Sequence, residues 1–440
     1  MIRNLQFSLV LFSILATSCT EKKEYIDIEP IVLHDTMQKL TDIIVHDIFS
    51  PPVASRVYVY PSIAAYEIMV QTDSTYISLK NQLNQFNGIP APQNKIDFEL
   101  AAIQAFINVG KALIFSEDKF EEYEIDFLSK IKEKNLDEKI INNSLSYAKA
   151  VSDAISEWYS KDNYNETRTY QKFDVIDEID RWQPTPPGYF EAIEPHWSKI
   201  RQFVIDSSNQ FMPDPPTKFD MTKDSDFYKE VMEVYEVSNN LNEEQAEIAS
   251  FWDCNPFVIN VQGHAMFATK KITPGGHWIN IAKIACQKDS ANFMKSIATY
   301  TLTSIALADG FISCWDEKYR SNLIRPETVI NNYIDPNWLP LLQTPPFPEY
   351  TSGHSVISGA AGVALSSIYG DSFSFEDDSE LVYGLPIRKY TSFTAASDEA
   401  AISRLYGGIH YMPAIKNGVT QGRELGKYLV NKIKMKHEKN

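Results

Sequence analysis

The chain has 440 residues, of which 44% are hydrophobic and 22% charged, a composition typical of folded globular proteins that excludes a disordered or fibrous chain. Its 41 basic and 58 acidic residues give a net charge of -17. Nucleic acids and anionic membrane surfaces are therefore disfavoured as partners, because their phosphates would be repelled.

The N-terminus has the features of a signal peptide over residues 1–18: a positive charge at Arg3, an apolar run over residues 5–16 and a small-residue region that ends at Cys19. This pattern resembles a bacterial lipoprotein signal in which Cys19 is lipidated, with residues 19–30 as a tether. We expect an exported lipoprotein that faces the periplasm or cell surface and meets the membrane only through its lipid anchor. Plain secretion is the alternative.

Three cysteines remain in the mature sequence: Cys254, Cys286 and Cys314. Their odd number, wide spacing and apolar surroundings argue against a disulfide framework. We expect buried, unpaired cysteines that pack as small apolar side chains.

Residues 31–162 are predicted to form an N-terminal helical bundle, since their apolar residues recur at spacings of three and four. The predicted helices cover residues 31–48, 53–71, 98–114, 120–134 and 136–160. Residues 163–222 are too rich in proline and aromatic residues for long helices, and they include the run from Trp182 to Tyr189. We interpret them as an ordered crossover whose aromatic side chains cover the core or line a pocket mouth.

Residues 223–440 are predicted to form a second, C-terminal helical bundle, which makes the fold class all-α. Its predicted helices cover residues 226–237, 242–252, 278–286, 293–315, 352–369, 394–406 and 415–433. Another helix is expected to open at Asn255-Pro256, and Pro274-Gly275-Gly276 is expected to separate two helices. No alternating strand pattern is present.

The candidate site begins with two cations, Lys318 and Arg325, seven residues apart. If one helix persists as far as Pro326, both side chains point to the same side of it. An arginine fork and a lysine charge together suit a phosphate-like anion. A solvated basic face is the alternative.

Two further groups follow in the C-terminal region. Ser352-Gly353-His354 stands at a predicted helix start, where free amides and the helix dipole favour an anion. Arg404 closes a later helix, and His410 follows it. Taken alone, the Ser-Gly-His triplet is more often a helix cap with an incidental histidine.

The order and spacing of these groups, Lys-x6-Arg-Pro, Ser-Gly-His and Ser-Arg-x5-His, resemble the active site of the superfamily that joins vanadium-dependent haloperoxidases and type 2 phosphatidic acid phosphatases. Over most of the mature chain the resemblance is to exported bacterial members on the haloperoxidase side. It implies paired helical bundles with the active site in the C-terminal one and vanadate as the cofactor. By the same resemblance His410 coordinates vanadium, His354 is the acid-base residue, Trp315 and Phe347 line the substrate pocket, and vanadate oxygens are bound by Lys318, Arg325, Ser352, Gly353 and Arg404.

Two positions depart from the family pattern. Thr351 replaces the proline that usually precedes Ser-Gly-His, and Ala414 stands where the family often has an aspartate that supports the last histidine. A backbone carbonyl, Asp398 or Glu399 could take over that support.

The resemblance implies oxidation of halide by hydrogen peroxide, with iodide or bromide favoured because iodide is oxidised most easily. The alternatives are a phosphatase that hydrolyses phosphomonoesters, in which His410 attacks phosphorus and His354 protonates the leaving group, and a non-catalytic anion-binding lipoprotein. The long helical architecture without membrane spans favours the peroxidase. A zinc site at His264 and His277 is not predicted, because no third ligand pattern lies near them.

Overall fold

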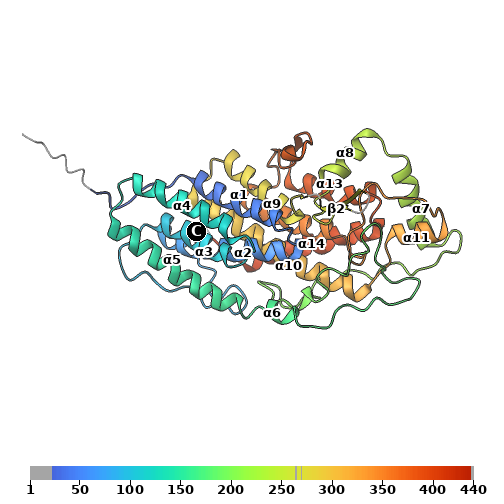
Figure 1. The fold of residues 1–440 in the computed structure, drawn as a ribbon, viewed down its shortest axis with the longest axis horizontal. Helices are drawn as coiled ribbons and strands as arrows, with labels where there is room; N and C mark the ends of the chain where they lie inside the picture. The colour runs from blue at the N-terminus through green and yellow to red at the C-terminus, as the bar shows by residue number, and fades with distance from the viewer. Residues whose placement is uncertain (1–21, 263–264, 269, 438–440) are drawn as a thin grey trace, which may run out of the picture.

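The computed structural model describes residues 22–437, apart from 263, 264 and 269. The predicted signal peptide and Cys19 lie outside this range. The molecule is elongated, with the N-terminal helices gathered at one end and the C-terminal helices at the other (Figure 1). Helices dominate the described residues, which confirms the predicted all-α class.

Five helices form the N-terminal part: α1 (Pro30–His46), α2 (Pro51–Met69), α3 (Phe98–Lys111), α4 (Glu117–Glu133) and α5 (Glu138–Tyr159). They agree with the predicted helices to within a few residues. α2 is buried along its whole length. Side-chain caps explain two of the helix starts, because Asp97 accepts a hydrogen bond from the Leu100 amide and Asp137 accepts one from the Lys139 amide.

The crossover contains only the short helix α6 (Tyr164–Thr167) and a 3-10 turn at Trp197–Lys199. Its packing confirms an ordered connection, since Trp182 and Trp197 are fully buried. The Asp309 carboxylate, in the middle of a central helix, accepts hydrogen bonds from three consecutive crossover amides, those of residues 203–205, at 2.7, 2.8 and 3.1 Å. The crossover is thereby fixed to the core.

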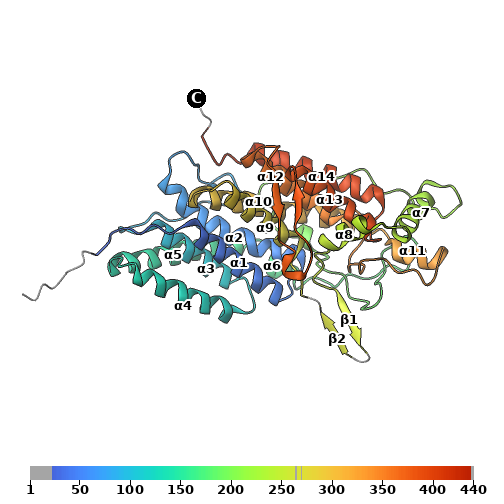
Figure 2. The ribbon, with the colours of Figure 1, turned by 90° about the horizontal axis from the view of Figure 1, so that it is seen from above.

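The C-terminal part contains α7 (Asp226–Asn239), α8 (Glu243–Phe251), α9 (Pro274–Lys288), α10 (Phe293–Ser321), α11 (Pro326–Tyr333), α12 (Gly353–Tyr369), α13 (Phe393–Tyr406) and α14 (Met412–Lys432). α10 runs through the middle of the molecule and packs against α2 on one side and α12 on the other (Figure 2). By length and composition α10 could cross a membrane, but its apolar window is entirely buried inside the protein. It is the core helix that joins the two ends.

One apolar core extends from Leu33 in α1 to Leu429 in α14. Because both predicted bundles share this core, it does not locate a boundary between them. The predicted boundaries at residues 162 and 222 stay predictions.

Two local predictions were wrong. No helix opens at Asn255-Pro256, because the Asn255 side chain accepts a hydrogen bond from the Phe257 amide at 3.0 Å and closes a turn instead. Pro274-Gly275-Gly276 does not separate helices but forms the first turn of α9, capped by the Thr273 hydroxyl, which accepts from the Gly276 amide at 3.1 Å. Proline in the first turn costs no hydrogen bond.

Two small hairpins were also absent from the sequence prediction. β1 (Ile259–Gln262) pairs antiparallel with β2 (Ala265–Ala268), and β3 (Phe375–Asp377) pairs antiparallel with β4 (Arg388–Tyr390). Strands of three or four residues are too short to show a period of two. The first hairpin projects from the helical body (Figure 2).

Close contact between α12 and α14 depends on glycines in α14. A Cβ atom on Gly422 would overlap the Val356 carbonyl oxygen, and a Cβ on Gly426 would lie 3.0 Å from the Ala360 carbonyl oxygen. The two helices therefore approach backbone to backbone. This packing sets the position of the start of α12, where Ser-Gly-His lies, relative to the loop that precedes α14.

Candidate active site

Lys318 and Arg325 lie on different elements, so the condition that one helix persists as far as Pro326 is not met. α10 ends at Ser321, since Asn322 adopts a left-handed conformation with φ of 48°, and Arg325 is the N-cap of α11. Asparagine is one of the few residues other than glycine that adopt this conformation readily. The chain turns at Asn322, and the two cations still reach the same part of the structure from different elements.

Arg325 is fully buried and forms the back of the site. Its Nε donates to the Phe347 carbonyl and its Nη1 to the Ile409 carbonyl, both at 2.9 Å, while Nη1 lies 3.2 Å from His410 Nε2. Nη2 is buried without a partner among the described residues. Burial lowers the pKa of this guanidinium to about 10.

Lys318 is also fully buried. Its Nζ donates to the carbonyl oxygens of Pro348 and Glu349 at 3.0 Å each and lies 5.1 Å from the centre of the Phe347 ring. Burial lowers the pKa of the Lys318 ammonium to about 7. The ammonium contacts the chain immediately before the Ser-Gly-His turn and thereby connects the first predicted group to the second.

Ser352, Gly353 and His354 open α12 as predicted. Ser352 is the N-cap, and its hydroxyl accepts from the Ser355 amide at 3.3 Å. The His354 ring is hydrogen-bonded to the Trp252 backbone, and its Nε2 is buried without a partner among the described residues. Burial, followed by the positive charge of Arg404, holds the pKa of His354 well below 6.5, so the ring is neutral.

Arg404 lies in the last turn of α13 and is fully buried. Its Nε donates to the Ser403 hydroxyl at 2.9 Å and its Nη2 to the Trp252 carbonyl at 2.7 Å. The same tryptophan backbone therefore contacts both Arg404 and His354. Burial lowers the pKa of Arg404 to about 10.

His410 has a carboxylate partner that the sequence reasoning missed. Its Nδ1 lies 2.7 Å from Glu349 Oε1, which also accepts from the Tyr411 amide at 3.0 Å. Asp398 and Glu399, the partners considered from the sequence, pair instead with Arg423 and Arg388. Glu349 lies three residues before Ser352, in a stretch rich in proline and aromatic residues. A single acidic residue in such a stretch is the sequence feature that could have identified the partner of His410.

Ala414 takes part in a backbone contact. Its carbonyl accepts from the Ser352 amide at 3.1 Å, which joins the start of α14 to the start of α12.

Burial and then the charge of Arg325 hold the pKa of His410 well below 6.5, and burial raises the pKa of Glu349 to about 7. A neutral imidazole whose Nδ1 hydrogen is donated to Glu349 leaves the lone pair on Nε2.

A cavity of about 40 Å³ lies between these groups. Of the predicted residues, six line it: Trp315, Phe347, Gly353, His354, Arg404 and His410. The rings of Trp315 and Phe347 pack against each other with their centres 5.0 Å apart. The other three predicted residues do not line the cavity but contact the lining residues or the segments that carry them: Lys318, Arg325 and Ser352.

The charge balance of this region favours an anion. Lys318, Arg325 and Arg404 are buried, yet none of the three forms an ion pair with a carboxylate among the described residues. Buried charges are normally paired. A bound oxyanion would compensate them and would give the unpartnered Arg325 Nη2 an acceptor, so the residues present fit an oxyanion ligand.

A family model described as the VCPO second helical-bundle domain matches residues 298–439. No curated protein matches the chain significantly. Two solved structures of a bacterial vanadium-dependent chloroperoxidase, in holo and apo form, are 16% and 15% identical with TM-scores of 0.68 and 0.64. They cover 88% and 87% of this chain and 93% and 94% of their own, and they show the shared fold.

A third solved structure, described as the first bacterial vanadium-dependent iodoperoxidase, is 53% identical to the chain with a TM-score of 0.90. The match covers 94% of this chain and 99% of that one. Identity at this level over nearly the whole of both chains, together with the convergence of the predicted residues on one cavity, shows that the chain belongs to the vanadium-dependent haloperoxidase family.

Proposed function

We propose that the protein is a vanadate-dependent haloperoxidase that oxidises halide with hydrogen peroxide. The observation that carries the proposal is a cavity lined by Arg404 and two neutral histidines, with Lys318 and Arg325 buried next to its lining; none of the three cations has a carboxylate partner among the described residues. Iodide is the favoured halide, because the relative at 53% identity is described as an iodoperoxidase and iodide is oxidised more easily than bromide.

Vanadate would be held by charge and by hydrogen-bond donors. Lys318, Arg325 and Arg404 would neutralise its oxygens, and Ser352 with Gly353 would add donors at the start of α12. His410 would coordinate vanadium through Nε2. When bound, vanadate supplies an electrophilic metal centre that activates hydrogen peroxide toward halide.

His410 is prepared for coordination by its partner. With Nδ1 donating to Glu349, the ring has the tautomer whose lone pair is on Nε2, and this lone pair faces Arg325 Nη1 at 3.2 Å, a contact that vanadium would replace. The carboxylate also increases the electron density of the ring. Glu349 would therefore act as a positioning residue for His410 in the role that the family often gives to an aspartate.

His354 is the candidate acid-base residue. It is neutral, lines the cavity and has a buried Nε2 without a partner among the described residues. We propose that this nitrogen accepts a proton from hydrogen peroxide and later returns it to the leaving oxygen. Burial and then the charge of Arg404 lower the pKa of His354, so the protonated ring gives up its proton readily.

Trp315 and Phe347 would form the apolar wall that halide meets. They pack against each other, and Trp315 is held by a hydrogen bond from its Nε1 to the Ile193 carbonyl at 3.2 Å. A rigid apolar wall excludes bulk water and strengthens the electrostatic interactions inside the site.

The test uses the purified full-length chain loaded with orthovanadate. We expect peroxide-dependent oxidation of iodide, weaker oxidation of bromide, and loss of both in His410→Ala. His196→Ala is the matched control, since that histidine bonds the Gln171 carbonyl in the crossover, and its activity should equal that of the unmodified chain. Hydrolysis of a phosphomonoester without vanadate, with no halide oxidation, would show a phosphatase instead. Absence of both activities would favour a non-catalytic anion-binding protein.

We also propose export and anchoring through lipid on Cys19, a proposal that rests on the sequence of residues 1–19. Metabolic labelling with a fatty acid should mark the unmodified chain in the membrane fraction. Cys19→Ala should be unlabelled, and equal labelling of both would contradict the proposal.

A further inference from the structure

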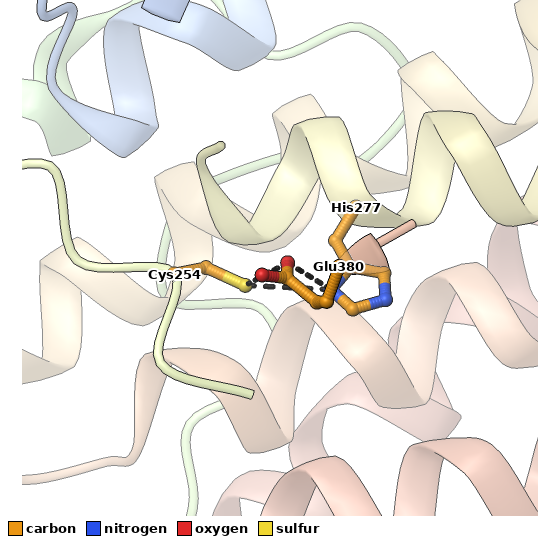
Figure 3. A group of neighbouring side chains, drawn as sticks. All are labelled: Cys254, His277 and Glu380. Carbon is orange, nitrogen blue, oxygen red and sulfur yellow. Dashed lines mark hydrogen bonds and ion pairs between the residues drawn. The ribbon is translucent and has the colours of Figure 1, made fainter. Parts of the chain in front are cut away.

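A second cluster of polar side chains lies beside the cavity and takes no part in the proposed reaction. Cys254 follows α8, His277 lies in the first turns of α9, and Glu380 stands between β3 and β4. Figure 3 shows the three side chains pointing toward one another from separate segments. All three are buried, and the potential ligand atoms lie within 4.8 Å of one another.

The spacing of these atoms matches a tetrahedral metal site. Cys254 Sγ lies 3.4 Å from His277 Nδ1, His277 Nδ1 lies 3.3 Å from Glu380 Oε1, and Cys254 Sγ lies 3.9 Å from the same oxygen. Bond lengths of about 2.3 Å to sulfur and about 2.0 Å to nitrogen and oxygen place tetrahedral ligand atoms about 3.3 to 3.6 Å apart. One ion would therefore reach all three with small movements of side chains.

His277 is oriented as metal-binding histidines usually are. Its other ring nitrogen, Nε2, lies 2.8 Å from Asp377 Oδ2, and the ring stacks on Trp252 with the ring centres 4.5 Å apart. A carboxylate that accepts the distal N–H of a ligating histidine fixes the tautomer with the lone pair on the metal side. Although burial opposes it, the charge of Asp377 raises the pKa of His277 well above 6.5, so a cation would displace a proton from Nδ1, the nitrogen that faces Cys254 and Glu380, and bind the lone pair exposed there.

The charges in the cluster are opposite in sign to those in the vanadate site. Two carboxylates and a thiol surround one imidazole, and all are buried. Such a set would repel an oxyanion, and a divalent cation would compensate it. A sulfur, a nitrogen and an oxygen ligand favour zinc over magnesium or calcium, which prefer oxygen alone.

We propose that Cys254, His277 and Glu380 bind one Zn²⁺ or a similar borderline divalent cation, with Asp377 as the positioning residue for His277. The three side chains fill three positions, and water takes the fourth. Binding takes the proton from the Cys254 thiol and the proton from His277 Nδ1, and both pass to solvent.

The ion would stabilise one wall of the active site. Cys254 lines the cavity, and Trp252, two residues earlier, contacts Arg404 and His354 through its backbone. A metal that joins this segment to α9 and to the chain between β3 and β4 would fix the Trp252 carbonyl in place. This role rests on the proposed function, whereas the metal binding does not.

The test measures metal binding without vanadate or peroxide. The full-length chain is treated with a chelator and titrated with Co²⁺, then with Zn²⁺. We expect one equivalent of Co²⁺ with a thiolate-to-cobalt charge-transfer band, and displacement of Co²⁺ by Zn²⁺. Cys254→Ser should lose the band, and Asp377→Asn should weaken binding by about 10- to 100-fold. Cys286→Ser is the matched control, because that buried cysteine contacts Tyr369 instead, and it should keep the band.

A folding defect in the Cys254→Ser chain does not block the test. Circular dichroism reports its fold, and the unmodified chain supplies an independent readout, since Zn²⁺ should raise its melting temperature and leave that of Glu380→Gln unchanged. An unmodified chain without the charge-transfer band, or equal metal affinity in the unmodified and Glu380→Gln chains, would overturn the proposal. Metal binding without halide oxidation would contradict the proposed function alone.

Discussion

Glu349 connects two of the three predicted groups, because its side chain accepts from His410 while its carbonyl accepts from Lys318. The cations, the histidines and the Ser-Gly-His turn could be predicted from residue type and order. The partner of His410 could not, since the distance between Glu349 and His410 depends on how the loop before α12 folds against the loop before α14. Ala414 at the expected position therefore does not leave His410 without a carboxylate.

Replacement of Glu349 by glutamine tests this assignment. The neutral amide accepts a weaker hydrogen bond from His410 Nδ1, so vanadate affinity should fall by about 10- to 100-fold and kcat for iodide oxidation should fall with it. Vanadate titration and steady-state kinetics measure the two effects. Asp398→Asn is the control, since Asp398 pairs with Arg423 at the surface, and it should behave as the unmodified chain does. Equal losses in both variants would contradict the role of Glu349.

The lowered pKa of Lys318 predicts the direction in which the stability of the folded chain changes with pH. Its pKa of about 7 in the folded chain lies below the ordinary value of 10.5, so between these values the unfolded state binds more protons and stability rises with pH. Below pH 7 the folded chain bears the cost of a buried charge, up to about 5 kcal/mol. Without vanadate, Lys318→Met should therefore be more stable than the unmodified chain at pH 6, and the difference should shrink toward pH 10. Urea unfolding at pH 6, 8 and 10 measures it, and a difference independent of pH would contradict the shift.

At the scale of elements, most helices could be predicted from apolar spacing, but the connections between them could not. The long run from Phe293 predicted α10, whereas the left-handed turn at Asn322 that ends it has no signal in the apolar pattern. Arg325 reaches the site because of that turn. The turn at Asn255 is likewise a side-chain effect with no apolar signal, and the hairpin β1–β2 that follows it has strands too short to show a period of two.

The α12–α14 contact sets the spacing between the Ser-Gly-His turn and His410. Gly422→Ala would place a methyl group against the Val356 carbonyl and force the helices apart, so it should lower both stability and iodide oxidation, with a loss of several kcal/mol in the free energy of unfolding. Gly310→Ala is the control, because a Cβ there lies 3.5 Å from Ile357, an ordinary contact. Thermal unfolding compares the two, and equal tolerance would contradict the tight contact.

Asp309 fixes the crossover to α10. Asp309→Ala would leave three buried amides without an acceptor and should lower the free energy of unfolding by about 3 kcal/mol or more. Asp153→Ala removes an exposed pair with Lys149 and should cost less than about 1 kcal/mol. Denaturant unfolding measures both values. A loss at Asp309 no larger than that at Asp153 would show that the crossover does not depend on this carboxylate.

At the scale of the whole molecule, a chain with a net charge of -17 buries in its core three cations that have no carboxylate partner in the described part of the chain. That arrangement costs folding free energy unless an anion compensates it. The burial of these cations therefore agrees with membership of a family that binds vanadate. The composition alone could only disfavour nucleic acids and anionic membrane surfaces as partners. The site is assembled from α10, the loop before α11, the start of α12, the end of α13 and the loop before α14, segments whose proximity only the folded chain reveals.

The most direct measurement of the central claim is a calorimetric titration of the purified chain with orthovanadate. We predict one vanadate per chain, with binding lost in Arg325→Met, Arg404→Met and His410→Ala and kept in His196→Ala. Vanadate binding that is equally strong in all of these variants would show that the buried cations and His410 do not form one oxyanion site.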